Sequence, residues 1–260
     1  MRFLKNKTIN KIKEIFTSDH VDNETLKKLK GDQRKGVQQL IKTYEKKQLK
    51  MIEMEQRFAE MCHYEKESYV KGRKYIAGID EAGRGPLAGP VVAAAVILPK
   101  EFKLIGLTDS KQLSKQKRED FYKVIVDQAI SYSISIINND VIDKINIYEA
   151  TKRAMTDSIQ RLDKKPDHVL IDAVKLDHLN LSTESIVKGD EKSISIAAAS
   201  IIAKVTRDHL MAHIHAKYPA YDFNSNMGYG TKHHIDMLLK HGVTPYHRMT
   251  FAPVRNVLNQ

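Results

Sequence analysis

The spacing of hydrophobic positions divides the chain near residue 72. In residues 1–71 the apolar side chains recur every three or four positions, which places them on one face of a helix. The positions with this spacing are Val37, Leu40, Ile41, Tyr44, Met51, Met54, Phe58 and Met61. Thr8 and Asn23 are polar residues suited to the start of a helix. We therefore expect a Lys-rich N-terminal region of two or three helices, with its boundary at Gly72.

From residue 72 to residue 260 the pattern changes to short apolar runs, which are typical of strands, with helical spacing between the later ones. The expected strands cover residues 75–79, 91–98, 131–137, 168–171 and 185–187, and the expected helices cover residues 147–162 and 195–217. Strands that come first and then alternate with helices predict an α/β domain, in which helices flank a mixed central sheet.

Composition and charge narrow the range of functions. Hydrophobic residues make up 42% of the chain, enough for a packed core, and the net charge is +11. A basic protein of this kind favours a nucleic-acid partner, although a basic surface can also serve solubility alone. The longest apolar run covers residues 91–98, far too short to span a membrane, and residues 1–15 do not read as a signal peptide.

Cysteine usage points to the cytoplasm. Cys62 is the single cysteine, which excludes an internal disulfide framework and fits a reducing compartment. The lack of a Cys/His cluster also argues against a structural zinc site. No obvious dimer interface is visible in the sequence, so we expect a monomer. The short apolar runs also lead us to expect no membrane contact.

Four acidic residues lie at strand ends or in a turn, where they could form an active site. Asp80 and Glu81 end the first strand, Asp172 ends the strand at 168–171, and Asp190 lies in a turn before the long helix. Active sites in open α/β sheets lie at such strand ends. Converging carboxylates need a cation, and oxygen ligands select Mg²⁺ or Mn²⁺. Any one of these acids alone could simply cap a turn, so the prediction depends on the combination.

A glycine-rich loop follows the first two acids. A P-loop is excluded, because Arg84 and Gly85 occupy the places of its Lys and its hydroxyl residue. A dinucleotide-binding loop fits Gly83, Gly85 and Ala88, but Pro86 and an apolar strand follow where a helix should begin. The loop instead offers a backbone that can approach a ribose closely. Its peptide groups could sense a 2′-hydroxyl, which distinguishes RNA from DNA.

Residues 79–90, with the sequence IDEAGRGPLAGP, closely resemble the signature of bacterial ribonucleases HII. Further segments match the family in the same order, at residues 108–113, 169–172, 187–190, 197–208, 228–232 and 247–248. The resemblance covers about residues 75–255, and the Lys-rich extension is similar to those of some Gram-positive members. It implies an RNase H-like fold with a mixed central sheet flanked by helices and a helical N-terminal extension.

The resemblance also implies an activity. The enzyme would hydrolyse the RNA strand of RNA/DNA hybrids, cutting 5′ of ribonucleotides, including single ribonucleotides embedded in duplex DNA. It would leave 3′-hydroxyl and 5′-phosphate ends and use two divalent ions, Mg²⁺ or Mn²⁺. Four carboxylates would hold them: Asp80 between both ions, Asp190 at the ion that activates water, and Glu81 and Asp172 at the ion near the leaving oxygen.

The resemblance implies roles for substrate-binding residues too. The loop of Gly83, Arg84 and Gly85 would grip the 2′-hydroxyl, and Tyr229 would stack on the next deoxyribose. Tyr229 could instead be a half-buried loop residue. Ser110 and Lys111 are predicted to meet backbone phosphate, the alternative being a turn serine and a solvated lysine.

Other polar residues are given structural roles. Arg207 and Asp208 are predicted to form an ion pair on a helix, and the 11 histidines are read as surface or core residues. Two rival functions stay open. One is the sister ribonuclease HIII, which would carry a strand-rich N-terminal domain. The other is a non-catalytic RNA/DNA hybrid-binding protein, against which the clustered acids argue.

Overall fold

The computed structural model describes residues 7–16, 21–176 and 178–259. Contacts divide the chain into two compact units, residues 1–57 and residues 58–260, which we call the N-terminal and the C-terminal unit. The division falls inside α4 (Lys35–Met61), earlier than the boundary at Gly72 that the sequence suggested. The physical reason is that Phe58 and Met61, at the end of α4, are buried in a core cluster of the C-terminal unit.

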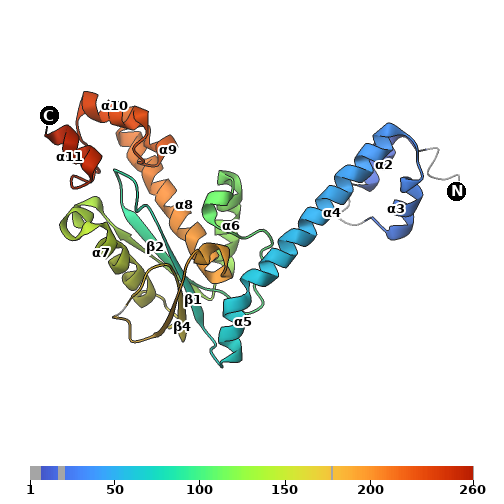
Figure 1. The fold of residues 1–260 in the computed structure, drawn as a ribbon, viewed down its shortest axis with the longest axis horizontal. Coiled ribbons are helices and arrows are strands. Elements are labelled where there is room, and N and C mark those ends of the chain that lie inside the picture. Colours follow the sequence, from blue (N-terminus) through green and yellow to red (C-terminus); the bar gives the residue numbers. More distant parts are fainter. Residues whose placement is uncertain (1–6, 17–20, 177, 260) are drawn as a thin grey trace. The chain divides into compact units, whose positions relative to one another are not determined.

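The N-terminal unit is helical, as the spacing of its apolar residues predicted (Figure 1). It contains α2 (Ile9–Ile15), α3 (Asn23–Lys30) and most of α4. Thr8 caps α2 by accepting a hydrogen bond from the backbone N–H of Lys11, as predicted, and Asp22, one residue before Asn23, caps α3. These helices enclose a small core of Ile12, Leu29, Val37 and Ile41.

The C-terminal unit is built around a five-stranded mixed sheet with the order β3-β2-β1-β4-β5. The strands are β1 (Ile76–Ala82), β2 (Val91–Ile97), β3 (Ser131–Ile137), β4 (His168–Asp172) and β5 (Ser182–Ile186). β1, β2 and β3 pair antiparallel, whereas β1 and β4, and β4 and β5, pair parallel. The structure thus confirms the predicted mixed sheet and the places of its first four strands, whereas β5 begins three residues before the predicted strand at 185–187.

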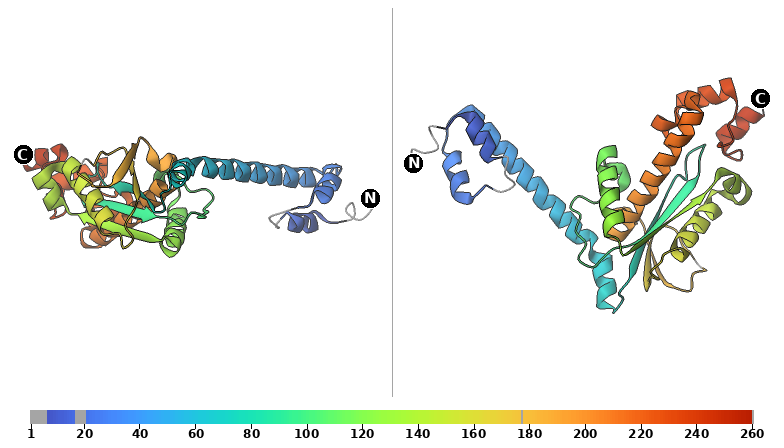
Figure 2. Two further views of the ribbon diagram at one scale, coloured as in Figure 1. Left: turned by 90° about the horizontal axis from the view of Figure 1, so that it is seen from below. Right: turned by 180° about the vertical axis from the view of Figure 1, so that it is seen from behind.

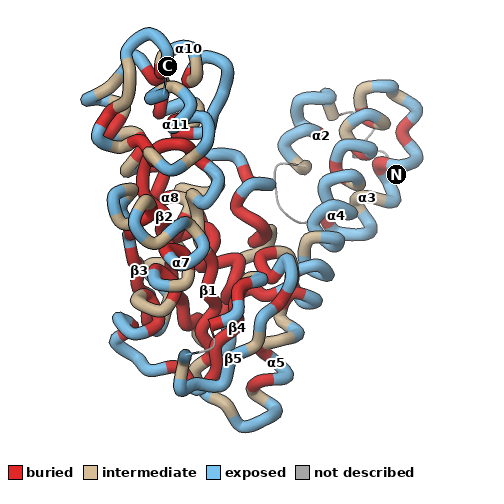
Figure 3. The backbone as a smooth tube through the Cα atoms, turned by 60° about the vertical axis from the view of Figure 1, so that its left-hand side comes forward, coloured by how far each residue is buried: buried red, intermediate tan, exposed pale blue. Residues whose placement is uncertain are grey.

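Helices cover both faces of this sheet (Figure 1 and Figure 2). One face packs on α7 (Asn139–Gln160), and the other packs on α8 (Ile194–Lys217), with α6 (Lys115–Gln128) beside α8. β1 and β2 are buried on both faces, which explains why β2 reads as a continuous apolar run (Figure 3). Gly78 lets α8 approach closely: a Cβ there would lie 2.0 Å from the backbone carbonyl carbon of Ser195.

Helix α7 begins earlier than the predicted helix at 147–162. Asn146 has a left-handed φ of 67°, which divides α7 into two helical segments. Its side-chain Oδ1 accepts hydrogen bonds from the backbone N–H groups of Tyr148 and Glu149. Asn146 therefore starts the second segment, which is the one that the periodicity predicted.

Shorter elements complete the C-terminal unit. They are α5 (His63–Val70), η1 (Ser110–Gln112), η2 (Gly189–Glu191), η3 (Pro219–Tyr221), α9 (Phe223–Asn226), α10 (Lys232–His241) and α11 (Ala252–Leu258). The last four enclose a further cluster that includes Phe223, Leu238 and Val254. Among the described helices, none combines the length and the apolar composition needed to cross a membrane.

Candidate active site

Two of the predicted acids end neighbouring strands on the same face of the sheet. β1 and β4 run parallel with Ile79 opposite Ile171, so Asp80 and Asp172 follow side by side at the carboxyl ends of these strands. Ile79 and Ile171 pack into the core on the α7 side. Because successive side chains of a strand alternate, Asp80 and Asp172 point to the face that α8 covers.

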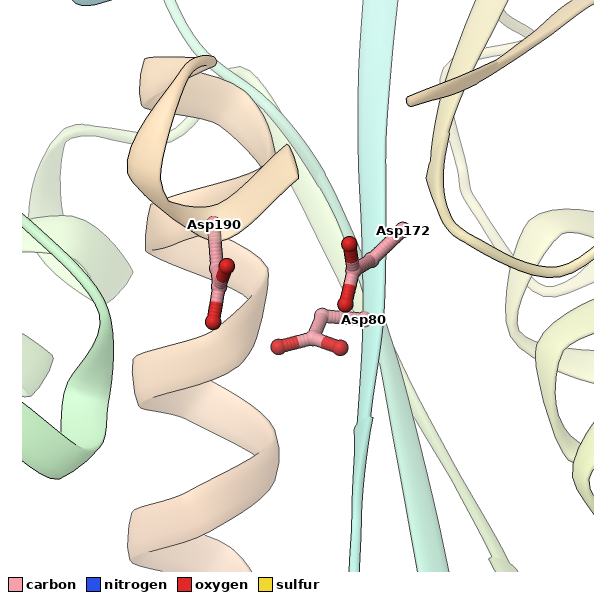
Figure 4. Close-up of side chains that lie close together, drawn as sticks. All are labelled: Asp80, Asp172 and Asp190. Atoms are coloured by element: carbon pink, nitrogen blue, oxygen red, sulfur yellow. The ribbon is translucent and has the colours of Figure 1, made fainter. Parts of the chain in front are cut away.

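Asp190 reaches the same place from the turn before α8. Lys188 adopts a left-handed conformation with a φ of 57°, and the N–H of Gly189 donates a 2.7 Å hydrogen bond to Oδ1 of Asp172. This bond ties the turn to the end of β4. As a result Asp80, Asp172 and Asp190 each offer a carboxylate oxygen, and these oxygens lie within 4.8 Å of one another (Figure 4).

Burial and mutual repulsion make this cluster electrostatically costly. Asp80 is 5% exposed. Its burial, followed by the nearby charges of Glu81 and Asp172, raises its pKa well above the ordinary value of an aspartate. Burial, and then the charge of Asp172, raises the pKa of Asp190 to about 6. The carboxylates therefore stand where a cation would relieve a large unfavourable charge.

Glu81 lies at the edge of this group. It follows Asp80 in β1, so its side chain leaves the strand in the opposite direction, and it is not among the three acids whose oxygens meet. Its Oε1 pairs with Nη1 of Arg84 at 3.4 Å, while its buried Oε2 has no hydrogen-bond partner within the described chain. Burial raises the pKa of Glu81, Arg84 opposes that rise, and Asp172 adds to it. Glu81 therefore has one oxygen available close to Asp172.

Lys111 supplies positive charge to the same cluster. It lies in η1, whose N-cap Asp109 accepts a 2.9 Å hydrogen bond from its backbone N–H. Burial disfavours the charged ammonium, but Asp109, Asp80 and Asp190 outweigh this effect and raise the pKa of Lys111. Lys111 thus remains charged beside the carboxylates.

Ser110 lies in η1 and forms a hydrogen bond inside the protein. Its side chain is buried, and its Oγ lies 3.0 Å from Oγ of Ser200 in α8. This hydrogen bond attaches η1 to α8. The contact of Ser110 with backbone phosphate stays a prediction.

The glycine loop is held by a buried arginine, which lies in the matching segment 247–248 but was given no role from the sequence. Arg248 is fully buried, and it donates hydrogen bonds to the carbonyl oxygens of Gly83 at 2.6 Å, Arg84 at 2.9 Å and Gly89 at 3.0 Å. In a trans peptide the N–H group points opposite to the C=O group. The N–H groups of Arg84 and Gly85 are therefore directed away from Arg248.

A second buried arginine, Arg207 of α8, supports the loop from another side. It donates hydrogen bonds to the carbonyl oxygens of Ala88 at 3.1 Å and Pro90 at 3.0 Å. Gly83 has a φ of +98°, and a Cβ there would lie 2.1 Å from Nε of Arg207. This position therefore requires glycine both for its backbone conformation and for lack of space. Burial lowers the pKa of Arg207 to about 10, which still leaves it charged near neutral pH.

The predicted ion pair between Arg207 and Asp208 was wrong. Asp208 is bonded to Lys204 at 2.7 Å and lies 3.9 Å from Arg118. Neighbouring residues on a helix point in different directions, whereas residues four apart meet. Lys204 is therefore the natural partner of Asp208, and the guanidinium of Arg207 is left for backbone carbonyls.

Tyr229 and the glycine loop face each other. Tyr229 is 49% exposed. A Cβ on Gly85 would lie 3.3 Å from Cε1 of its ring, although 143 residues separate the two positions in the chain. The loop, the tyrosine and the carboxylates, which come from separate segments of the sequence, thus form one region of the C-terminal unit.

The donor set fits a hard divalent cation. Within the described residues, the group that could hold a metal ion consists of Asp80, Asp172 and Asp190, which provide oxygen donors only. Glu81, which follows Asp80 in β1, has a buried Oε2 without a hydrogen-bond partner in the described chain. Sulfur and imidazole ligands, which soft or borderline metals prefer, are not part of the group. The arrangement is therefore suited to ions such as Mg²⁺ and Mn²⁺.

Comparison with known families covers both parts of the chain. The family model described as ribonuclease HII matches residues 77–254, and the model described as ribonuclease HII N-terminal domain matches residues 8–69. Ribonuclease HII of Oceanobacillus iheyensis is 54% identical over 251 residues, which make up 96% of each chain. Ribonuclease HII of Enterococcus faecalis is 53% identical over 252 residues, covering 96% of this chain and 98% of the relative.

Solved structures agree with this relationship. The crystal structure of ribonuclease H2 from Pyrococcus horikoshii is 27% identical and superposes with a TM-score of 0.63. The match covers 71% of this chain and 97% of that protein. The catalytic residues predicted from the sequence lie inside the segment that matches the first family model. The chain thus belongs to the ribonuclease HII family, and it is an endoribonuclease that hydrolyses phosphodiester bonds.

Proposed function

We propose that the protein cuts the RNA strand of RNA/DNA hybrids and also cuts duplex DNA on the 5′ side of single embedded ribonucleotides, leaving 3′-hydroxyl and 5′-phosphate ends. The observation that carries the proposal is the convergence of Asp80, Asp172 and Asp190 near a glycine loop opposite Tyr229. We also expect it to act as a monomer in the cytoplasm.

The carboxylates have distinct tasks in this proposal. Asp80, the most central and most buried of them, would lie between two Mg²⁺ or Mn²⁺ ions, with Asp190 at one ion and Asp172 and Glu81 at the other. Bound there, the ions would activate a water molecule and stabilise the leaving oxygen of the phosphodiester. Lys111 would remain charged beside them and meet a non-bridging phosphate oxygen.

Selection for RNA would come from the backbone. Arg248 holds the carbonyl groups of Gly83 and Arg84 on one side of the loop, so the N–H groups of Arg84 and Gly85 face the other side. Such donors can bind a ribose 2′-hydroxyl whichever base is attached. Recognition would therefore depend on the sugar and not on base sequence.

Tyr229 would select the sugar on the other side of the cut. Its exposed ring lies close to Gly85, so one nucleotide held at the loop would place its neighbour against the tyrosine. A flat ring packed on a deoxyribose leaves no room for a 2′-hydroxyl. The glycine loop and Tyr229 together would thus favour a step from ribose to deoxyribose, as found at a single embedded ribonucleotide.

The test is to map cleavage of a DNA duplex that contains one ribonucleotide, with and without added Mg²⁺ or Mn²⁺. We expect a single cut on the 5′ side of the ribonucleotide, with a 3′-hydroxyl product and no cutting in the presence of a chelator. Cleavage only of longer RNA tracts would instead indicate the activity of the sister family, ribonuclease HIII. Binding without any cleavage would indicate a hybrid-binding protein.

A further inference from the structure

The N-terminal unit carries a disproportionate share of the positive charge. Residues 1–57 contain 15 Lys and Arg residues and 8 Asp and Glu residues. They therefore contribute +7 of the net charge of +11, although they make up less than a quarter of the 260 residues. A charge so concentrated creates a local field that attracts polyanions.

Part of this charge forms a row on one face of α4. Lys35, Lys42, Lys46 and Lys50 follow one another at intervals of seven, four and four residues, and all four are exposed. These intervals bring side chains to the same side of a helix. Val37, which is buried in the core of the unit, lies on the opposite side. We call these four lysines the basic row.

The basic row differs from Lys28 and Lys30 of the same unit in having no acidic partner within the described part of the chain. Among the described residues, none of its four ammonium groups takes part in an ion pair, whereas Lys28 pairs with Glu24 at 2.6 Å and Lys30 pairs with Glu45 at 2.7 Å. The cations of the basic row thus remain available to an external anion. At 1.5 Å per residue, neighbouring charges of the row are about 10, 6 and 6 Å apart along the helix axis.

We propose that the basic row binds the phosphate backbone of duplex nucleic acid, and that the N-terminal unit anchors the enzyme without reading sequence. The proposal rests on the proposed function in that a duplex is the substrate. A protein partner is less suitable, because protein interfaces have an apolar, aromatic-rich centre depleted of charge. A row of flexible, solvated cations is the arrangement that phosphate contacts require.

The experiment compares full-length protein with the variant K35Q/K42Q/K46Q/K50Q. Binding to a DNA duplex without ribonucleotides is followed by fluorescence anisotropy in chelator at several salt concentrations. Each phosphate contact contributes about 0.9 to the slope of log K against log salt concentration. We expect the slope to become shallower by roughly 2 to 4, and duplex affinity at low salt to fall at least tenfold.

Two further variants serve as controls. K28Q/K30Q changes lysines of the same unit that are already paired, so we expect a much smaller change in slope. The variant K35R/K42R/K46R/K50R keeps the charge of the basic row and should bind as the parent does. Equal slopes for the parent and for K35Q/K42Q/K46Q/K50Q, with both folded by circular dichroism, would overturn the proposal. The binding assay involves no catalysis, so its outcome is independent of the proposed function. The proposed function would instead be refuted if the parent did not cleave a ribonucleotide-containing duplex.

A second inference concerns a buried pair of histidines behind Tyr229. The Nε2 atoms of His234 and His247 lie 3.0 Å apart, and both residues are fully buried. The backbone N–H of Thr244 donates to Nδ1 of His247 at 2.8 Å, so that nitrogen carries no proton. Nδ1 of His234 lies 2.9 Å from the carbonyl oxygen of Tyr229.

These contacts fix the direction of each hydrogen bond. If Nδ1 of His247 is an acceptor, its Nε2 carries the proton and donates to Nε2 of His234. His234 then carries its own proton on Nδ1 and donates it to the carbonyl of Tyr229. Both rings are neutral, in agreement with burial lowering the pKa of His234 and lowering that of His247 to about 4.

We infer that His234 and His247 are positioning residues that hold Tyr229 at the glycine loop, an inference that rests on the proposed role of Tyr229 in sugar selection. The test compares H234L, which loses both bonds, with H234N, whose amide can still donate to the carbonyl of Tyr229. The readout is the ratio of cleavage at a ribose–deoxyribose step to cleavage within a run of ribonucleotides. We expect the ratio to fall roughly fivefold in H234L, the factor that one ordinary hydrogen bond represents, and to recover in part in H234N.

A purely structural role would lower stability or the amount of active enzyme without changing this ratio. The inference is therefore overturned if folded H234L keeps the ratio of the parent. It is also overturned if H234N and H234L change the ratio equally, because the donor to Tyr229 would then have no effect.

Discussion

Removing one acid from the candidate active site should stabilise the metal-free protein while it abolishes activity. The perturbation is Asp80→Asn, which keeps the size of the side chain and removes its charge. Asp80 is buried beside Asp172 and Asp190, and its pKa is raised by burial and by neighbouring acids. Without bound cations, folding must bring these carboxylates together against their repulsion.

The magnitude follows from the spacing of the oxygens. Two full charges 4.8 Å apart repel by about 3.5 kcal/mol at an effective dielectric constant of about 20. The raised pKa of Asp80 means that protonation already relieves part of this repulsion. We therefore expect Asp80→Asn to add about 1 to 3 kcal/mol to the free energy of unfolding in chelator. For a unit of this size, that corresponds to a rise in Tm of roughly 3 to 10 °C.

The assay is thermal unfolding at pH 8, in chelator and with saturating Mn²⁺. The Tm of the parent should rise when Mn²⁺ is added. Asp80→Asn should have a higher Tm than the parent in chelator, and this Tm should rise little with Mn²⁺. The variant should show no cleavage. Asp163→Asn changes an exposed carboxylate of a loop and serves as the matched control. If Asp80→Asn melts at or below the temperature of the parent in chelator, the reasoning from charge crowding is refuted.

Three further predictions concern the surroundings of the acids. Lysine in place of Arg248 cannot reproduce the hydrogen bonds to the glycine loop. We therefore expect Arg248→Lys to lower the free energy of unfolding, measured in urea, by about 2 to 4 kcal/mol. The variant should also show a weaker preference for RNA over DNA in binding assays. Metal binding requires deprotonated carboxylates, and the pKa of Asp190 is about 6 while that of Asp80 is also raised. Mn²⁺ affinity measured by calorimetry should therefore fall at least tenfold per pH unit below pH 6, and a flat profile would contradict this. Glu65 accepts hydrogen bonds from Ser193 and Ser195 at the start of α8. Glu65→Ala should therefore lower the free energy of unfolding by about 1 to 3 kcal/mol, as measured by thermal unfolding. Glu65→Gln, which keeps an acceptor oxygen, should lower it much less.

Periodicity and strand ends made much of the fold and of the site predictable. The buried strand β2 and the alternating strand β3 were readable because each buries a defined set of side chains. Asp80 and Asp172 stand at strand ends, so a shared edge of the sheet was a reasonable expectation. That β1 and β4 are neighbours, which brings the two acids side by side, became visible only in the structure.

Contacts that depend on tertiary packing were not predictable. The carbonyl groups at residues 83–90 that Arg207 and Arg248 bind lie more than a hundred residues away, and no local pattern signals an arginine buried against backbone. The same holds for Ser110, whose partner lies on α8. Phe58 continues the periodicity of α4, and the pattern does not reveal which core it enters. In each case the local sequence allows several partners, and only the packing of distant segments selects one.

The central claim is that acids distant in the chain jointly hold a pair of hard cations. It is tested most directly by anomalous scattering from crystals of the protein grown with Mn²⁺ and a duplex containing one ribonucleotide. We predict two peaks about 4 Å apart, bound by Asp80, Asp172 and Asp190, next to the phosphate on the 5′ side of the ribonucleotide. Peaks elsewhere, or no peak at these carboxylates in a crystal that contains the duplex, would contradict the claim.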